Sequence, residues 1–215
     1  MEEIFSFKVI HRDKRSRALT KANFGCLTGL YTLNITMGCS FSCAYCYARA
    51  YPNAPHQGIV ELFSNLPKLL ERELSSKRRK EWPDYIIMNT ASDCFQPHPD
   101  ILQITYEVME TLLKKDIGFS FLTKGFIPAN FLDLFKKYSF MIKAQIGLVS
   151  LSNKFWKHFE PGAASPEQRL ENVTRLKEIG IQPEVRMDPI VPFLTDGQEE
   201  VDKLMRALNE RGIEA

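Results

Sequence analysis

The sequence lacks any apolar run near the roughly 20 residues that a membrane-spanning helix needs. It also lacks a secretory signal, because its first residues, Met1-Glu2-Glu3, are acidic where such a signal is basic and then apolar. No charge of one sign dominates, since 28 lysines and arginines nearly balance 26 aspartates and glutamates. We therefore expect a cytoplasmic protein without membrane contact, and the net charge by itself does not indicate a nucleic-acid partner.

A disulfide scaffold is also disfavoured, because the sequence has five cysteines, an odd number, in a chain without export signals. Three of them, Cys39, Cys43 and Cys46, fall within eight residues, whereas Cys26 and Cys94 stand apart. In a reducing compartment, clustered thiols are more often metal ligands or redox groups than disulfide partners. The triplet is therefore the first candidate for chemistry.

From residue 31 onward, strand and helix signals alternate along the chain. Alternation with crossovers long enough to hold a helix predicts a mostly parallel sheet with right-handed connections. A closed eight-stranded barrel typically needs about 250 residues, so we expect an open doubly wound sheet or a partial barrel. The expected strands are 31–37, 85–90, 118–123, 141–150 and 182–187. The expected helices are 65–79 with Asn65 as its cap, 100–115, 128–137, a helix between the Ser165 cap and Gly180, and 198–211.

The triplet reads C-x3-C-x2-C, a spacing that lets one loop place three thiolates around one metal centre. A four-iron cluster held by three thiolates keeps one iron open to another ligand, whereas electron-transfer clusters usually have four protein ligands. A structural zinc site also needs four ligands, and the fourth would have to be Cys26, Cys94 or His56. Both types of centre remain open at this point.

The triplet resembles the motif of the radical S-adenosylmethionine (SAM) superfamily, which has this spacing and an aromatic residue before the third cysteine, here Tyr45. The position after the first strand of an alternating chain is also similar. Over residues 16–196 the sequence more closely resembles the spore photoproduct lyase-like, or DNA repair photolyase-like, branch. The matching segments are Leu33-Asn34, Gly38-Cys39, Cys46-Tyr47-Ala48-Arg49, Glu160-Pro161, Arg169-Leu170, Gly180-Ile181 and Pro189-Ile190-Val191-Pro192.

This resemblance implies a partial (β/α) barrel of the radical SAM type with mostly parallel strands. It implies that Cys39, Cys43 and Cys46 hold a 4Fe-4S cluster whose open iron binds S-adenosyl-L-methionine. An external electron donor of the flavodoxin or ferredoxin type would reduce the cluster, SAM would be cleaved to a 5′-deoxyadenosyl radical, and the radical would abstract hydrogen from the substrate. A damaged nucleobase in DNA is the candidate substrate. The alternative is a non-enzymatic zinc or iron-sulfur binding module.

The resemblance also implies a set of residues that bind the cofactor. Tyr45 matches a tyrosine beside the adenosyl group, Lys124 matches a lysine that pairs with the methionyl carboxylate, and Ser92, Asp93 and Ser150 match residues that hydrogen-bond the cofactor. Each of these also has a structural alternative, such as packing, helix capping or a solvated lysine. Arg186 is a candidate for a different reason: it interrupts an apolar strand, where a buried guanidinium needs an anionic partner. That partner is the cofactor carboxylate, Asp188 or Glu184.

Two residues are candidates for catalysis. Tyr47 matches a tyrosine near the reacting centre. Cys94 follows the second expected strand, where the lyase has a cysteine that returns hydrogen to the product radical. The lyase cysteine, however, matches the position of Thr90, and Cys94 lies two residues after Ser92. Cys94 is therefore either a displaced hydrogen donor or an inert small residue.

The resemblance divides the chain into a basic N-terminal extension, residues 1–30, and a barrel core, residues 31–215. The core is expected to be incomplete at its C-terminus, because a sixth strand should begin near residue 212. Two basic runs, residues 12–17 and 77–80, are candidates for contacts with DNA phosphates. Their alternatives are a solvated tail and the C-terminal turn of a helix.

Overall fold

The computed structural model describes residues 7–23, 25–76 and 82–213, and its strands form two sheets. The larger sheet has six strands in the order β2-β3-β6-β7-β8-β9, in which β2 is antiparallel to β3 and all later neighbours are parallel. Its strands are β2 (Thr20–Lys21), β3 (Tyr31–Leu33), β6 (Tyr85–Met88), β7 (Gly118–Thr123), β8 (Ile142–Gly147) and β9 (Glu184–Arg186). The expected α/β class with mostly parallel strands is confirmed.

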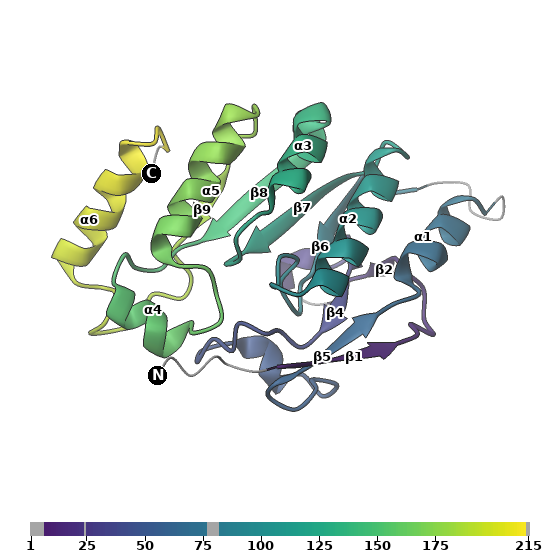
Figure 1. Ribbon diagram of the computed structural model, residues 1–215, viewed down its shortest axis with the longest axis horizontal. Helices are drawn as coiled ribbons and strands as arrows, with labels where there is room; N and C mark the ends of the chain where they lie inside the picture. The colour runs from purple at the N-terminus through teal and green to yellow at the C-terminus, as the bar shows by residue number, and fades with distance from the viewer. Residues whose placement is uncertain (1–6, 24, 77–81, 214–215) are drawn as a thin grey trace.

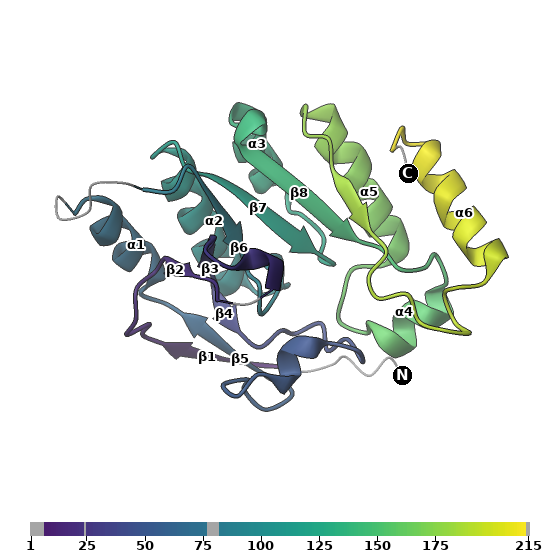
Figure 2. The same ribbon diagram turned by 180° about the vertical axis from the view of Figure 1, so that it is seen from behind.

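Helices α2, α3 and α5 lie on one face of this sheet, as the two opposite views show (Figure 1, Figure 2). The helices are α1 (Leu66–Leu74), α2 (Pro99–Leu113), α3 (Ala129–Lys137), α4 (Asn153–Phe159), α5 (Pro166–Glu178) and α6 (Gln198–Asn209), with short 3-10 turns at Gly25–Leu27, Tyr47–Ala50 and Ser139–Met141. Each long helix buries one apolar stripe; in α2, for example, Ile101, Val108 and Leu112 have no exposed surface. None of the helices in the described ranges is long and apolar enough to cross a membrane.

The smaller sheet has three strands in the order β1-β5-β4 and lies at the edge of the molecule. Its strands are β1 (Lys8–Arg12), β5 (Ile59–Phe63) and β4 (Thr36–Met37). β1 runs parallel to β5 and β4 runs antiparallel to it. Residues 8–12 and 20–21 therefore pair with the remainder of the chain, one segment in each sheet.

The prediction of one continuous strand over residues 31–37 is wrong, because the structure divides these residues between the two sheets. Tyr31–Leu33 pairs with β6, whereas Thr36–Met37 pairs with β5. The change of partner occurs at Ile35, whose N–H donates to the side chain of Asn89 (2.9 Å) while its carbonyl accepts from the N–H of Phe63 (3.1 Å). These partners are distant in sequence, so the alternating pattern of the strand does not reveal the break. Because of this break, the cysteine loop, which follows β4, starts between the two sheets.

The other expected elements differ from the structure mainly at their ends. β7 has the expected bounds, and α5 begins with the expected capping box and is followed by Gly180 with φ of +84°. α1 ends at Leu74, five residues before the expected end, and Ser75 and Ser76 are not helical. Residues 77–79 of the expected helix and the basic run 77–80 lie outside the described residues. Asn65 occupies the expected N-cap position of α1, but its side chain makes no cap hydrogen bond, because it bonds the backbone of Lys14 in both directions. β1, β2, β5 and α4 were not expected from the sequence.

The capping box predicts a stability effect at Ser165. Its hydroxyl accepts from the N–H of Gln168 (3.2 Å), and the Gln168 side chain accepts from the N–H of Ser165 (2.9 Å). We expect Ser165→Ala to lower the free energy of unfolding by about 1 kcal/mol, because the first turn of α5 loses an acceptor. The measurement is urea denaturation of the metal-free chain. Ser76→Ala, at a serine that caps no helix N-terminus, is the control, and an equal loss in both variants would contradict the assignment.

Candidate active site

The three clustered cysteines lie in the loop between β4 and the 3-10 turn Tyr47–Ala50 and line one cavity of about 380 Å³. The opposite wall comes from the loops after β6, β7 and β9, so the cavity lies at the carboxyl ends of the parallel strands. The lining residues are Cys39, Phe41, Cys43, Tyr45, Cys46, Tyr47, Ala48, Asn89, Thr90, Ala91, Ser92, Asp93, Leu122, Lys124, Asp188 and Pro189. The thiols also line an adjoining hollow of about 60 Å³.

Buried polar side chains fix the beginning of this loop. The Gln96 side chain, which has no exposed surface, accepts from the N–H of Ser40 (2.8 Å) and donates to the hydroxyl of Thr36 (2.9 Å). Thr36 in turn donates to Ser92 (2.8 Å). Gly38 allows a sharp turn, since its φ is +80° and a Cβ there would lie 2.5 Å from the carbonyl oxygen of Ile59. Side chains of the segment between β6 and α2 therefore fix the first half of the cysteine loop.

Burial makes two of the loop thiols weak acids in the metal-free chain. It raises the pKa of Cys39 well above its usual value and raises the pKa of Cys43 to about 12, with Glu160 as the next cause for Cys43. Lys124 acts in the opposite direction on Cys43. The thiols of Cys39 and Cys43 are therefore protonated at neutral pH, and any metal that they bind must displace these protons.

Asp93 and Lys124 form the wall opposite the cysteines. One carboxylate oxygen of Asp93 accepts from the N–H of Phe95 (2.8 Å) and the hydroxyl of Thr123 (2.7 Å), and the other accepts from the N–H of Lys124 (2.9 Å). Burial raises the pKa of Asp93, although these hydrogen bonds oppose the shift. Asp93 thus ties the β6–α2 loop to the end of β7. The half-buried side chain of Lys124 lines the cavity, and its Nζ lies over the Tyr45 ring, 5.5 Å from the centre of the ring.

Tyr45 connects the cysteine loop to a buried ion pair. Its hydroxyl donates to Glu160, and Glu160 pairs with Arg169 at 2.5 Å. The side chains of Glu160 and Arg169 are 3% and 1% exposed. Burial, followed by the charge of Glu160, raises the pKa of Tyr45, so this hydroxyl keeps its proton. Sequence reasoning gave Glu160 and Arg169 no role beyond the resemblance. The available signal was that Arg169 lies on the same helical stripe as buried Val173 and Leu176.

The cavity also contains Tyr47 and Ser92. Tyr47 is exposed at the cavity wall, and its hydroxyl donates to the carbonyl of Thr90 (3.0 Å). The Ser92 hydroxyl is engaged with Thr36 and with the side-chain amide of Asn89 (3.1 Å). Asn89, Thr90 and Asp188 line the cavity without having been singled out as ligand-binding residues. Asn89 has a φ of +52°, a conformation that its sequence context does not reveal.

Three candidate residues lie elsewhere. Cys94 has no exposed surface, belongs to the hydrophobic core and does not line the cavity. Ser150 is also absent from the cavity wall, and its hydroxyl accepts from the N–H of Ser152 (3.0 Å). The expectation that Arg186 is buried is wrong. β9 is the terminal strand of the sheet, so the side chain is 47% exposed, and it lies 4.0 Å from Asp188, one of its expected partners.

The donor set fits an iron-sulfur cluster better than a single zinc ion. Zinc bonds of about 2.3 Å in a tetrahedron bring the ligand sulfurs within about 4 Å of one another. Among the described residues, no group of three cysteine, histidine or acidic side chains is arranged in this way. None of the three residues expected as a fourth zinc ligand, Cys26, His56 and Cys94, lines the cavity. Three soft thiol donors around one space match a cluster with an open iron.

Comparison with known proteins bears on these features. Residues 33–208 match the family described as the radical SAM superfamily. An uncharacterized protein of Methanocaldococcus jannaschii is 29% identical over 170 residues, which are 77% of this chain and 62% of that protein. The radical SAM Nalpha-GlyT isomerase of Pseudomonas phage M6 is 28% identical, over 85% of this chain and 37% of the isomerase. The chain spans about three fifths of the length of the first curated relatives that it matches.

The fold is similar to that of spore photoproduct lyase. A solved structure of a lyase mutant with bound AdoMet and dinucleoside spore photoproduct superposes with a TM-score of 0.69 at 18% identity, over 93% of this chain and 57% of the lyase. At this identity the likeness concerns the fold. The partial (β/α) barrel expected from the resemblance is thereby confirmed.

Two glycines provide a test of how tightly the cysteine loop is packed. Gly38 and Gly29 have similar φ values, +80° and +88°, but a Cβ at Gly29 would meet nothing within 4 Å. Both alanine variants carry the strain of a positive φ, and only Gly38→Ala adds a clash with Ile59 and Pro55. We expect Gly38→Ala to lower the free energy of unfolding by about 2 kcal/mol more than Gly29→Ala, measured by urea denaturation. Equal losses would show that the loop yields freely.

Proposed function

The chain belongs to the radical SAM superfamily, and on that premise we propose that it is an enzyme that binds a 4Fe-4S cluster and S-adenosyl-L-methionine and abstracts hydrogen from a substrate. The observation that carries this proposal is the common cavity of Cys39, Cys43 and Cys46, which lies at the carboxyl ends of the parallel strands. In this proposal the three thiols are the cluster ligands. SAM binds in the remaining part of the cavity, between the cysteines and the wall that contains Asp93 and Lys124.

When bound and reduced by an external donor of the flavodoxin or ferredoxin type, the cluster and SAM supply a 5′-deoxyadenosyl radical that abstracts hydrogen. The residues of the chain orient and shield these groups. Lys124 offers an ammonium group to the SAM carboxylate, and it is the only lysine or arginine among the described residues that line the larger cavity. Tyr45 offers a ring face to the adenosyl group. Asp93 fixes the backbone of Lys124 (2.9 Å) and has no oxygen left without a protein donor.

For the substrate, we propose a damaged nucleobase in DNA. The support is the similarity of fold to spore photoproduct lyase, whose solved complex contains dinucleoside spore photoproduct, together with the exposed ring of Tyr47 at the cavity wall. Tyr47 is the proposed catalytic residue next to the substrate. A role of Cys94 in returning hydrogen is not favoured, because the thiol is enclosed in the core.

Replacement of one loop cysteine tests the cluster assignment. We expect the native chain, reconstituted anaerobically with iron and sulfide, to hold about four iron atoms and to form 5′-deoxyadenosine when dithionite and SAM are added. Cys43→Ala should abolish both properties, because two thiolates cannot hold the cluster. Cys26→Ala, at an exposed cysteine outside the cavity, should retain both. Iron content and product formation are measured by metal analysis and chromatography.

Two results would contradict the proposal. Cleavage of SAM by Cys43→Ala would refute the ligand assignment. Bound zinc without any cleavage in the native chain would instead support the non-enzymatic module.

The DNA assignment is tested through salt dependence. The side chains of Arg15 and Arg17 are exposed, whereas Arg12 pairs with Glu61 at 2.9 Å and Lys14 lies over the Phe63 ring. We expect affinity for a photodamaged oligonucleotide to fall as salt rises, and Arg15→Ala and Arg17→Ala each to reduce the slope by about one. Fluorescence anisotropy measures binding. Lys203→Ala, which removes an ammonium paired with Glu199 on α6, is the control. An affinity independent of salt would count against phosphate contacts.

A further inference from the structure

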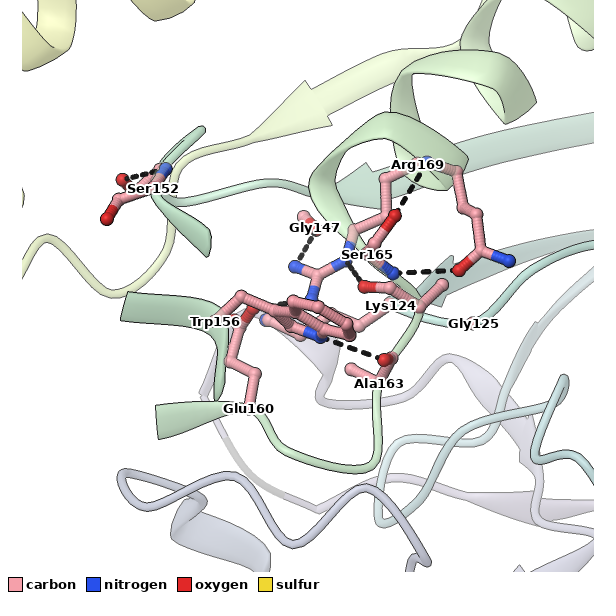
Figure 3. A network of polar contacts seen from close by, with 12 residues as sticks. Lys124, Gly125, Gly147, Ser152, Trp156, Glu160, Ala163, Ser165 and Arg169 are labelled. Carbon is pink, nitrogen blue, oxygen red and sulfur yellow. Dashed lines mark hydrogen bonds and ion pairs between the residues drawn. The ribbon is translucent and has the colours of Figure 1, made fainter. Parts of the chain in front are cut away.

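Arg169 is a fully buried cation whose three nitrogens reach three separate parts of the site. Its Nε donates to the carbonyl of Ala164 (2.8 Å), its Nη1 donates to the carbonyl of Gly147 (3.0 Å), and its Nη2 pairs with Glu160 (2.5 Å). Figure 3 shows the Arg169 side chain reaching from α5 toward Gly147 and Glu160. Gly147 ends β8, and Glu160 follows α4. One guanidinium therefore joins a strand end to the α4–α5 segment.

The Glu160 arm reaches the cysteine loop. One carboxylate oxygen accepts from the Tyr45 hydroxyl and the other pairs with Arg169, so neither oxygen is left for a ligand. Two backbone bonds run alongside: the N–H of Ala44 donates to the carbonyl of Phe159 (2.8 Å), and the N–H of Gly162 donates to that of Phe41 (3.1 Å). The position of the Tyr45 ring is therefore set by Glu160, and that of Glu160 is set by Arg169.

The Gly147 arm reaches Lys124. A Cβ at Gly147 would lie 2.9 Å from the Cγ of Lys124 and 3.0 Å from its Nζ, so the lysine side chain lies directly over this glycine. The carbonyl of Lys124 accepts from the N–H of Ala164 (2.9 Å), the residue whose own carbonyl Arg169 holds. Arg169 thus supports Lys124 from both Gly147 and Ala164.

These two arms meet at one contact, because the Nζ of Lys124 lies over the Tyr45 ring, 5.5 Å from its centre. A guanidinium has a rigid planar fork, which can hold three acceptors at fixed separations, whereas an ammonium on a flexible stem cannot. We propose that Arg169 is a positioning residue that sets the spacing between Tyr45 and Lys124 and thereby the affinity for SAM. This inference rests on the proposed function.

Arg169→Lys tests the inference, because it keeps the charge and removes the fork. We expect the iron content per chain to stay at the native value, while the Kd for SAM rises about tenfold, as expected when one charge-assisted contact is misplaced. The change that SAM produces in the electron paramagnetic resonance spectrum of the reduced cluster should require correspondingly more SAM. Binding is measured by anaerobic calorimetry, which does not depend on turnover.

Leu112→Ala is the control for stability alone. Leu112 is fully buried in α2 and does not line the cavity, so its truncation should lower the melting temperature and leave the Kd for SAM unchanged. The inference is overturned if Arg169→Lys binds SAM within about twofold of the native Kd, or if Leu112→Ala weakens binding as much.

Gly147→Ala serves as a second variant, and it decides the question if Arg169→Lys fails to fold or to hold iron. The added Cβ would lie 2.9 Å from the Cγ of Lys124, so the flexible lysine side chain must shift while the ion pair keeps both its partners. We therefore expect weaker SAM binding at an unchanged melting temperature. An unchanged Kd in this variant would overturn the inference. Failure of the proposed function is a distinct result, because the native chain itself would then form no cluster and bind no SAM.

Discussion

The ion pair between Arg169 and Glu160 is the contact on which the geometry of the site depends. Both side chains are withdrawn from water, at 1% and 3% exposure, and neither charge is tolerable there without the other. Removal of one partner leaves a buried charge without compensation, which costs about 3–5 kcal/mol, whereas an apolar pair of similar size would pack without that risk. The pair therefore contributes more to the specificity of the arrangement than to stability. It fixes where the cysteine loop meets the α4–α5 segment.

A second constraint comes from the two sheets. In the six-stranded sheet the parallel strands from β3 to β9 all end at one edge, so the loops that follow them meet there without long excursions. The chain leaves this sheet after Leu33 and joins the small sheet at Thr36. This change of sheet turns the cysteine loop across the open strand ends. The side chains of Asn89 and Gln96 satisfy the backbone groups that the crossing exposes.

Features with local signals were predictable from the sequence, and features that depend on distant partners were not. The bounds of β7 and the capping box at Ser165 follow from a few adjacent residues, and both were correct. The division of residues 31–37 depends on Asn89 and Phe63, which no local pattern reveals. The prediction that the Arg186 side chain is buried was wrong for the same reason, because only the strand order shows that β9 is an edge strand.

The site itself was predictable to a similar degree. The spacing of the three cysteines identified the loop. The resemblance to the spore photoproduct lyase-like branch identified Ser92, Asp93 and Lys124, which all line the same cavity. The network behind that wall was missed, since Glu160, Arg169 and Gln96 act through contacts that join segments more than 50 residues apart in some cases. Polar residues on the buried stripe of a helix, as in α5, are the sequence feature that most directly points to such a network.

The electrostatics of the cavity follow from how these polar groups are used. The carboxylates of Asp93 and Glu160 are both engaged by protein donors, and their negative charges disfavour thiolates at Cys39 and Cys43, respectively. Lys124 opposes this effect at Cys43. The thiols of Cys39 and Cys43 therefore keep their protons in the metal-free loop, and a positively charged metal centre is required to stabilise thiolates there. With Asp93 and Glu160 occupied inside the protein, Lys124 is the cation in this wall that can attract an anion.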